Sequence, residues 1–158
     1  MAERALPFPI RIRDAFFVQL EKIGLDDETK WHTQPKTKAL HNGQAVMNMF
    51  DAPRPALFLR TGDKSGEYWA GEVHKDQVDI VVYCVSEDVH DPELGLWLLM
   101  ADVERLFKEN YTMTPVLDSG FLQWTGSEPH MEEVAGKEGV GFGLVRGHAY
   151  YQSDDVNT

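Results

Sequence analysis

The chain has a single cysteine and no long hydrophobic run, and each of these shortages excludes a class of protein. The lone thiol, Cys84, cannot form a disulfide within the chain and fits a reducing compartment. No apolar stretch approaches the roughly 20 residues that a membrane-spanning helix needs. The first residues also lack the apolar segment of a signal peptide. We therefore expect a soluble intracellular protein that does not enter a membrane.

Positive charge is also scarce. Acidic residues number 26 against 15 Lys and Arg, and the net charge is −11. Affinity for duplex nucleic acid comes mainly from neutralising phosphates with Lys and Arg. We therefore expect no tight binding to nucleic acid.

What the chain does have is the composition of a folded domain. Its 158 residues are enough to bury a real core, and 42% of them are hydrophobic. No internal repeat or linker divides the sequence. We predict a single domain over residues 1–158, with flexible polar ends.

The first helical pattern covers residues 10–23. Its apolar positions recur at spacings of three and four: Ile12, Phe16, Leu20 and Ile23. Phe17 widens this stripe, and Gly24 stands where a glycine often ends a helix. We expect this helix to lie across a sheet.

A second helix is predicted for residues 92–109. Asp91 can cap its first amides, Pro92 suits the first helical position, and Glu93 favours the positive end of the helix dipole. Apolar residues occupy much of its circumference, which predicts a sheet on one side and another subunit on the other. The candidate subunit-interface residues are Leu96, Leu99, Met100 and Val103.

Several segments read as strands. They are 45–50, 56–60, 78–85, 121–125 and the glycine-rich 139–146. The segment 78–85 is apolar on both faces, as expected of a central strand. In the last segment glycines fill one face, which predicts a backbone or ring packed close by. Helix, strands, helix, strands without βαβ repeats indicates an α+β fold with a mainly antiparallel mixed sheet on two helices.

Two segments are predicted to reach out from this core. Residues 25–54 lack strong periodicity and are interpreted as a long loop or arm, which is often functional. A glycine-rich turn over 61–66 precedes Tyr68 and Trp69, and the glycines at 66 and 71 favour a projecting hairpin or loop. Partner contact and simple loop packing are equally compatible with the two aromatics. The candidate partner-contact residues there are Asp63, Lys64, Tyr68 and Trp69.

No catalytic or cofactor motif accompanies these elements. Cys84 lies in an apolar strand, where a buried inert thiol is expected. His74 and Asp76 share a strand face, but no third metal ligand is evident. The run Gly139–Gly143 lacks the Lys and the helix of a phosphate loop. We expect no enzyme, no metal and no cofactor.

The order of these pieces resembles the tail terminator (tail-completion) proteins of long-tailed bacteriophages, the group that contains the lambda tail terminator. The resemblance covers about residues 10–147. The matching features, in chain order, are the helix at 12–23, the segment Arg54–Arg60, the strand 78–85, the helix that begins after Asp91 and the late glycine-rich strand. The resemblance implies a small subunit that assembles as a six-membered ring. It also implies that the ring caps the tail tube and contacts tail tube and neck or head-closure proteins.

This resemblance further implies a place in the virion, at the tail or neck, after assembly in the host cytoplasm. An acidic protein suits a ring through which DNA passes without being held. Two alternatives remain open from the residues. One is another phage neck, head-closure or baseplate component, and the other is a small ligand-binding or enzymatic domain near Trp31, His32, His74 and Asp76.

Overall fold

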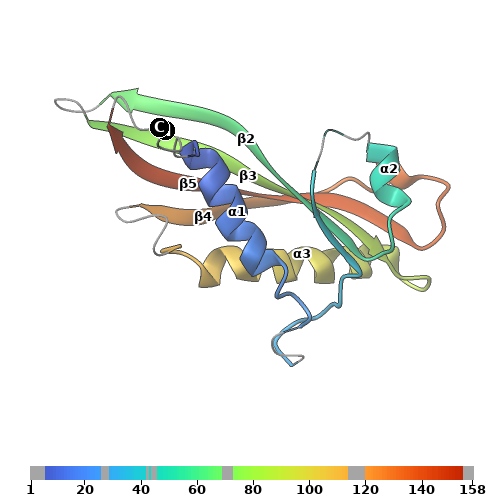
Figure 1. Ribbon diagram of the computed structural model, residues 1–158. Coiled ribbons are helices and arrows are strands. Elements are labelled where there is room, and N and C mark those ends of the chain that lie inside the picture. The colour runs from blue at the N-terminus through green and yellow to red at the C-terminus, as the bar shows by residue number, and fades with distance from the viewer. Residues whose placement is uncertain are drawn as a thin grey trace, which may run out of the picture.

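The chain folds as a mixed sheet with helices on both faces, as seen in a computed structural model (Figure 1). The structure describes residues 6–25, 29–41, 43, 46–68, 73–113 and 120–154. In chain order the elements are α1 (Phe8–Leu20), β1 (Thr37–Leu40), α2 (Val46–Phe50), β2 (Ala56–Tyr68), β3 (Val73–Glu87), α3 (Pro92–Glu109), β4 (Phe121–Pro129), η1 (Met131–Val134) and β5 (Val140–Asp154). The predicted α+β class is confirmed.

The sheet has five strands in the order β1-β2-β3-β5-β4. Only the short edge strand β1 runs parallel to its neighbour, and the other three pairings are antiparallel. Strand β3 lies in the centre and pairs along its whole length with β5, from Val73 opposite Asp154 to Glu87 opposite Val140. The predicted apolar segment 78–85 is therefore a central strand, as expected.

One face of the sheet carries the main core, beneath α1 and α3. The predicted stripe Ile12, Phe16, Leu20 and Ile23 is fully buried there. From the sheet, alternate residues such as Leu57, Leu59, Ile80 and Val82 enter the same cluster. The helix α1 begins two residues earlier than predicted and ends at Leu20, and a turn with Gly24 at a φ of +81° follows it.

Among the residues that the structure describes, the opposite face is covered only near one end. There α2 and η1 pack over Ala56, Phe58, Val85 and Phe142. In Figure 1 α2 stands at the opposite end of the sheet from the free ends of β2 and β5. The remainder of this face carries polar and aromatic side chains instead of a helix, and it is described below.

The helix α3 lies against the glycine face of β5. A Cβ atom at Gly141 would come within 2.9 Å of the Pro92 carbonyl oxygen and 3.0 Å of the Leu96 Cβ. A Cβ at Gly147 would overlap the ring of Phe107, and one at Gly143 would lie 3.1 Å from the Met100 sulfur. The prediction of a closely packed neighbour is confirmed at Gly141 and Gly143, and Gly147, beyond the predicted segment, is a further position of this kind.

Three local predictions were wrong. The predicted arm 25–54 contains β1, and the predicted strand at 45–50 is the short helix α2. Met49 and Phe50 are both buried in the same cluster, which a strand could not achieve because its neighbouring residues point to opposite faces. Methionine also favours a helix.

The third error concerns the glycine-rich turn at 61–66, which belongs to β2. A bulge between Thr61 and Lys64 shifts the register and lets the strand continue. Gly62 and Gly66 face the side chains of Asp79 and Asp76 across the β2–β3 pair, where a Cβ would come within 2.9 Å and 2.6 Å of them. These glycines make room for aspartates within a long hairpin instead of forming a turn.

The close approach of α3 to β5 gives a stability prediction. We expect Gly141→Ala to lower the free energy of unfolding by about 1–3 kcal/mol, because the added methyl meets helix backbone that cannot move alone. Gly126→Ala in β4 is the matched control, since its Cβ would have no neighbour within 4 Å. Urea unfolding of both variants tests this, and equal stability of the two would contradict it.

Candidate interaction surfaces

The four residues predicted to form a subunit interface are core residues instead. Leu96, Leu99, Met100 and Val103 have no exposed surface and pack between α3 and the sheet. The sequence pattern could not separate a helix face that meets a sheet from one that meets another chain, because both require apolar side chains. Any subunit contact of α3 must use its other side.

That other side is apolar in its first half. Leu94 is 50% exposed and Trp97 is 40% exposed. Their spacing of three residues puts them together on the helix surface. Beside them, Leu98 and Ala101 are half-buried. The expectation that α3 also meets another subunit stays a prediction, now placed on Leu94 and Trp97.

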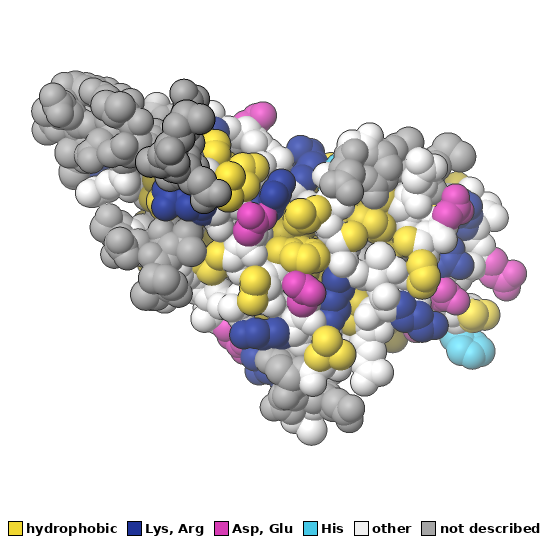
Figure 2. Space-filling view, viewed as in Figure 1, with side chains coloured by type: hydrophobic (Ala, Val, Ile, Leu, Met, Phe, Trp, Pro, Cys, Tyr) yellow, Lys and Arg dark blue, Asp and Glu magenta, His cyan; other side chains and the backbone are white. Residues whose placement is uncertain are grey.

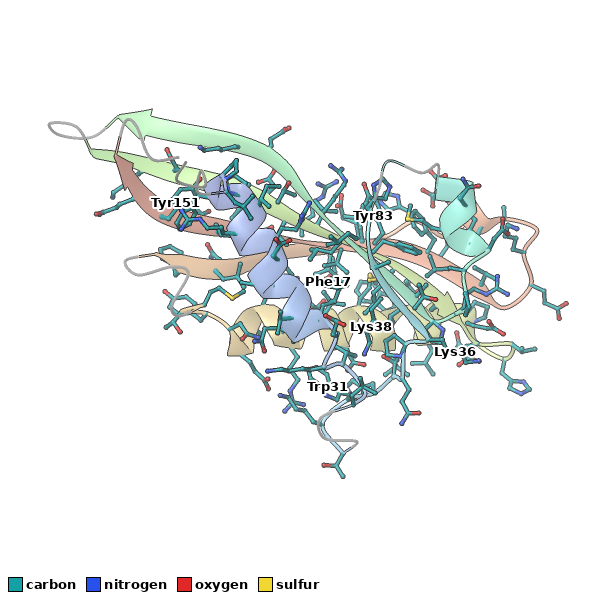
Figure 3. The ribbon with its side chains drawn as sticks, viewed as in Figure 1. Phe17, Trp31, Lys36, Lys38, Tyr83 and Tyr151 are labelled. Carbon is teal, nitrogen blue, oxygen red and sulfur yellow. The ribbon has the colours of Figure 1, made fainter. Side chains whose placement is uncertain are left out.

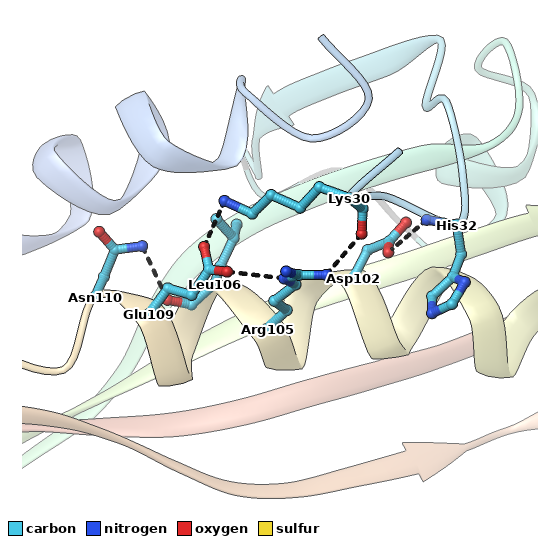
Figure 4. A network of polar contacts seen from close by, with 7 residues as sticks. All are labelled: Lys30, His32, Asp102, Arg105, Leu106, Glu109 and Asn110. Atoms are coloured by element: carbon cyan, nitrogen blue, oxygen red, sulfur yellow. Dashed lines mark hydrogen bonds and ion pairs between the residues drawn. The ribbon is translucent and has the colours of Figure 1, made fainter. Parts of the chain in front are cut away.

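One side of α3 is covered by the segment that precedes β1. Asp102 is only 1% exposed, and its carboxylate accepts a hydrogen bond from the His32 amide at 2.9 Å (Figure 4). It also accepts hydrogen bonds from the Thr33 amide at 2.8 Å and the Thr33 hydroxyl at 2.5 Å. These bonds hold Trp31, 7% exposed, in the core cluster. The predicted arm is therefore anchored where it passes α3.

The same segment is held at a second point, near the end of α3. Glu109 accepts from Lys30 at 2.5 Å and from Arg105 at 2.8 Å, while Arg105 also donates to the Lys30 carbonyl at 2.8 Å (Figure 4). Desolvation raises the pKa of Glu109, but the hydrogen bonds and charges of Arg105 and Lys30 outweigh it and leave the pKa lowered. Lys30 also lies 4.7 Å from the Trp31 ring centre.

Sequence reasoning missed Asp102 as an anchor. Its signal was present, because it is the one carboxylate inside the apolar run Leu98-Leu-Met-Ala-Asp-Val103. A charged residue in a buried helix face needs partners. The identity of those partners, main-chain amides about 70 positions earlier, is visible only in the folded chain.

The predicted partner-contact residues are strand residues as far as the structure describes them. Asp63 and Lys64 lie in β2 at the bulge, and Lys64 approaches the buried Asp76 at 3.9 Å. Tyr68 ends β2, its side chain lies outside the described part, and Trp69 lies outside the described residues altogether. The projecting hairpin is confirmed, whereas a loop beginning at residue 61 is not.

The part of the sheet that α2 and η1 leave uncovered is lined by paired polar groups. Arg60 donates to the Tyr83 hydroxyl at 2.7 Å, Arg146 pairs with Glu128 at 2.6 Å, and His148 lies 3.1 Å from Asp79. Beyond them, an aromatic ladder runs from Tyr111 through Phe121 to Tyr150, with ring centres 5.5 Å and 4.8 Å apart. The polar side chains of this surface are held by contacts with one another.

Two side chains with reactive groups, Cys84 and Tyr151, are in unreactive settings. Burial raises the pKa of the Cys84 thiol well above its usual range, and the Glu104 carboxylate raises it further. Burial, aided by the charge of Asp76, also raises the pKa of Tyr151 to about 12 although Arg11 lowers it. Both groups stay protonated at neutral pH and offer neither a nucleophile nor a base.

No protein-family model matches this chain, and no curated protein matches its sequence. Within the described residues, no group of three or more His, Cys, Asp or Glu side chains is placed to hold a metal ion. None of the described helices has the length and apolar character needed to span a membrane.

The anchor at Asp102 gives a second prediction. We expect Asp102→Ala to cost about 2–3 kcal/mol of stability, because it leaves two amides and a hydroxyl without their acceptor. Hydrogen exchange should show the His32 and Thr33 amides losing protection first. Asp14→Asn changes an exposed carboxylate whose ion-pair partner among the described residues is its neighbour Arg13, and it should alter neither quantity. Unaltered exchange at those two amides would contradict the anchoring role.

The lowered pKa of Glu109 gives a prediction about pH. A carboxyl group whose pKa is lower in the folded than in the unfolded state stabilises the fold at pH values above its ordinary pKa of 4.5. This stabilisation is lost as the pH falls through the pKa of the folded state. Glu109→Gln should therefore cost about 0.5–1 kcal/mol at pH 7, a small value because the side chain is 36% exposed. The difference from wild type should vanish at acid pH. A difference that persists there, or an equal loss in the exposed control Glu133→Gln, would refute it.

Proposed function

We propose that this chain is a tail terminator of a long-tailed bacteriophage: a structural subunit that assembles as a ring, caps the tail tube and connects it to neck or head-closure proteins. The proposal rests first on the order of elements that carries the resemblance. The helix over the sheet, the central strand, the Asp91-capped helix and the glycine strand fold together as one packed unit.

The observation that carries the proposal is the length of the central strands. β2 has 13 residues, and β3 and β5 have 15 each. Figure 1 shows these strands extending past the ends of α1 and α3, as an arm that leaves the helix-covered body. An arm of paired backbone, rigid by its hydrogen bonds, is suited to reaching a neighbouring subunit or a tube end.

The net charge of the chain and the protonated state of Cys84 and Tyr151 are compatible with this role. A net charge of −11 suits a ring through which DNA passes, because phosphates are repelled and not held. An enzymatic role finds no support in Cys84 or Tyr151, which both stay protonated. The ring would form in the host cytoplasm and remain at the tail or neck of the virion.

The test is the mass of the chain in solution, alone and with the tail tube protein encoded nearest to it. By light scattering on a sizing column we expect an assembly of about six copies, a closed ring with heterologous contacts. Electron microscopy should show tubes of arrested length when the chain is present during their polymerisation.

A chain that stays monomeric and leaves tube growth unchanged would overturn the proposal. Binding to a neck or head-closure protein without any effect on tubes would instead support the alternative role in the neck. A baseplate role would be indicated by association with the opposite end of the tube.

A further inference from the structure

We propose that the start of α3 and the outer side of α1 are the two halves of one contact between copies of this chain. The inference rests on the proposed ring function and names the surfaces that would build it. The acidic surface consists of Asp88, Asp91, Glu93, Leu94 and Trp97. The basic surface consists of Arg11, Arg13, Val18, Lys22 and Lys38.

The acidic surface combines concentrated charge with exposed apolar area. Among the described residues, no Lys or Arg forms an ion pair with its three carboxylates, and the basic group beside them is His90, next to Asp88. Asp88 and Asp91 are held in place by main-chain amides, and these hydrogen bonds, from Asp91 and then His90, lower the pKa of Asp88. Leu94 and Trp97, half exposed, lie one helical turn from this charge. An exposed tryptophan beside leucine is typical of the centre of an interface.

The basic surface has the complementary character. Val18 is 54% exposed on the outer side of α1. Lys22 follows it by one turn, and Lys38 reaches the end of the helix, donating to the Glu21 carbonyl at 2.6 Å. Within the described part of this surface there are four basic side chains and two acidic ones, Glu21 and Asp14, of which Asp14 pairs with Arg13 at 2.9 Å. Figures 2 and 3 show this side of α1, with Phe17 toward the middle of the view and hydrophobic side chains beside basic ones.

The two surfaces cannot meet within one copy. The helix α1 packs against the second half of α3, where the rings of Phe16 and Phe107 lie 4.8 Å apart. Leu94 stands 13 residues before Phe107, about 20 Å away along the helix. Figure 1 shows the first turn of α3 at the end away from α1.

The occupant of each surface is therefore a second copy of this chain. Each copy presents both surfaces, which differ from one another, so their contact is heterologous and repeats from copy to copy. A closed ring satisfies every acidic and every basic surface at once. The apolar side chains Val18, Leu94 and Trp97 would form its dry centre and the charges its rim.

A charge exchange tests this contact. We expect Lys22→Glu and Glu93→Lys each to raise the dissociation constant of the assembly about tenfold or more, because each places like charges together. The double variant carrying both changes should return to within about threefold of wild type, since it restores opposite charges. Light scattering over a dilution series measures all three. Both sites are exposed, and circular dichroism should confirm unchanged folding.

The matched controls are Gln123→Glu and Gln123→Lys. Gln123 is exposed on β4 and pairs with His148 on the uncovered side of the sheet, so neither charge should affect assembly. Trp97→Ala should weaken the assembly without any charge change.

The outcomes separate this inference from the proposed function. An assembly that forms, caps tubes and ignores both single exchanges would overturn the contact and leave the terminator role standing. Failure of the double variant to recover, with its fold intact, would likewise overturn it. A wild-type chain that is monomeric and does not affect tubes would overturn both.

Discussion

The close packing of α3 on the glycine side of β5 is the contact on which the rest of the structure depends. Glycines at 141, 143 and 147 remove the side chains that would hold the helix away, and the backbone of Pro92 and the ring of Phe107 occupy the space. This close approach buries Leu96, Leu99, Met100 and Val103 completely. It also fixes the helix axis against the central strands. The segments that are bonded to α3 are therefore held in a definite position.

Two attachments follow from that position. Asp102 on the helix accepts hydrogen bonds from the main chain at His32 and Thr33, and Glu109 pairs with Lys30 about two turns further along the same side of the helix. The segment before β1 is thereby drawn over α3 and delivers β1 to the sheet edge. What remains exposed on α3 is its apolar start, next to the carboxylates that cap it. The inferred contact between copies uses this exposed start of α3.

Prediction from sequence worked where one residue's environment is set by its neighbours along the chain. The stripe from Ile12 to Ile23, the cap at Asp91 and the glycine face of β5 are local patterns, and all three were found as expected. It failed where a pattern has two structural meanings. Gly62 and Gly66 resemble turn glycines, yet they make room for Asp79 and Asp76 on the neighbouring strand. The segment that contains Met49 and Phe50 likewise resembles a strand in sequence, yet it forms α2, which buries both side chains in one cluster.

The sequence by itself determined the α+β class, the two main helices, the central strand and the unreactive setting of Cys84. Periodicity, capping and composition act over a few residues and need no knowledge of distant contacts. Only the tertiary structure decided which side of α3 is core and which is exposed. It also decided that Asp102 accepts hydrogen bonds from a segment about 70 positions earlier. Those facts depend on which parts of the chain meet in space, because an apolar side chain looks the same in sequence whether it faces a sheet or another copy.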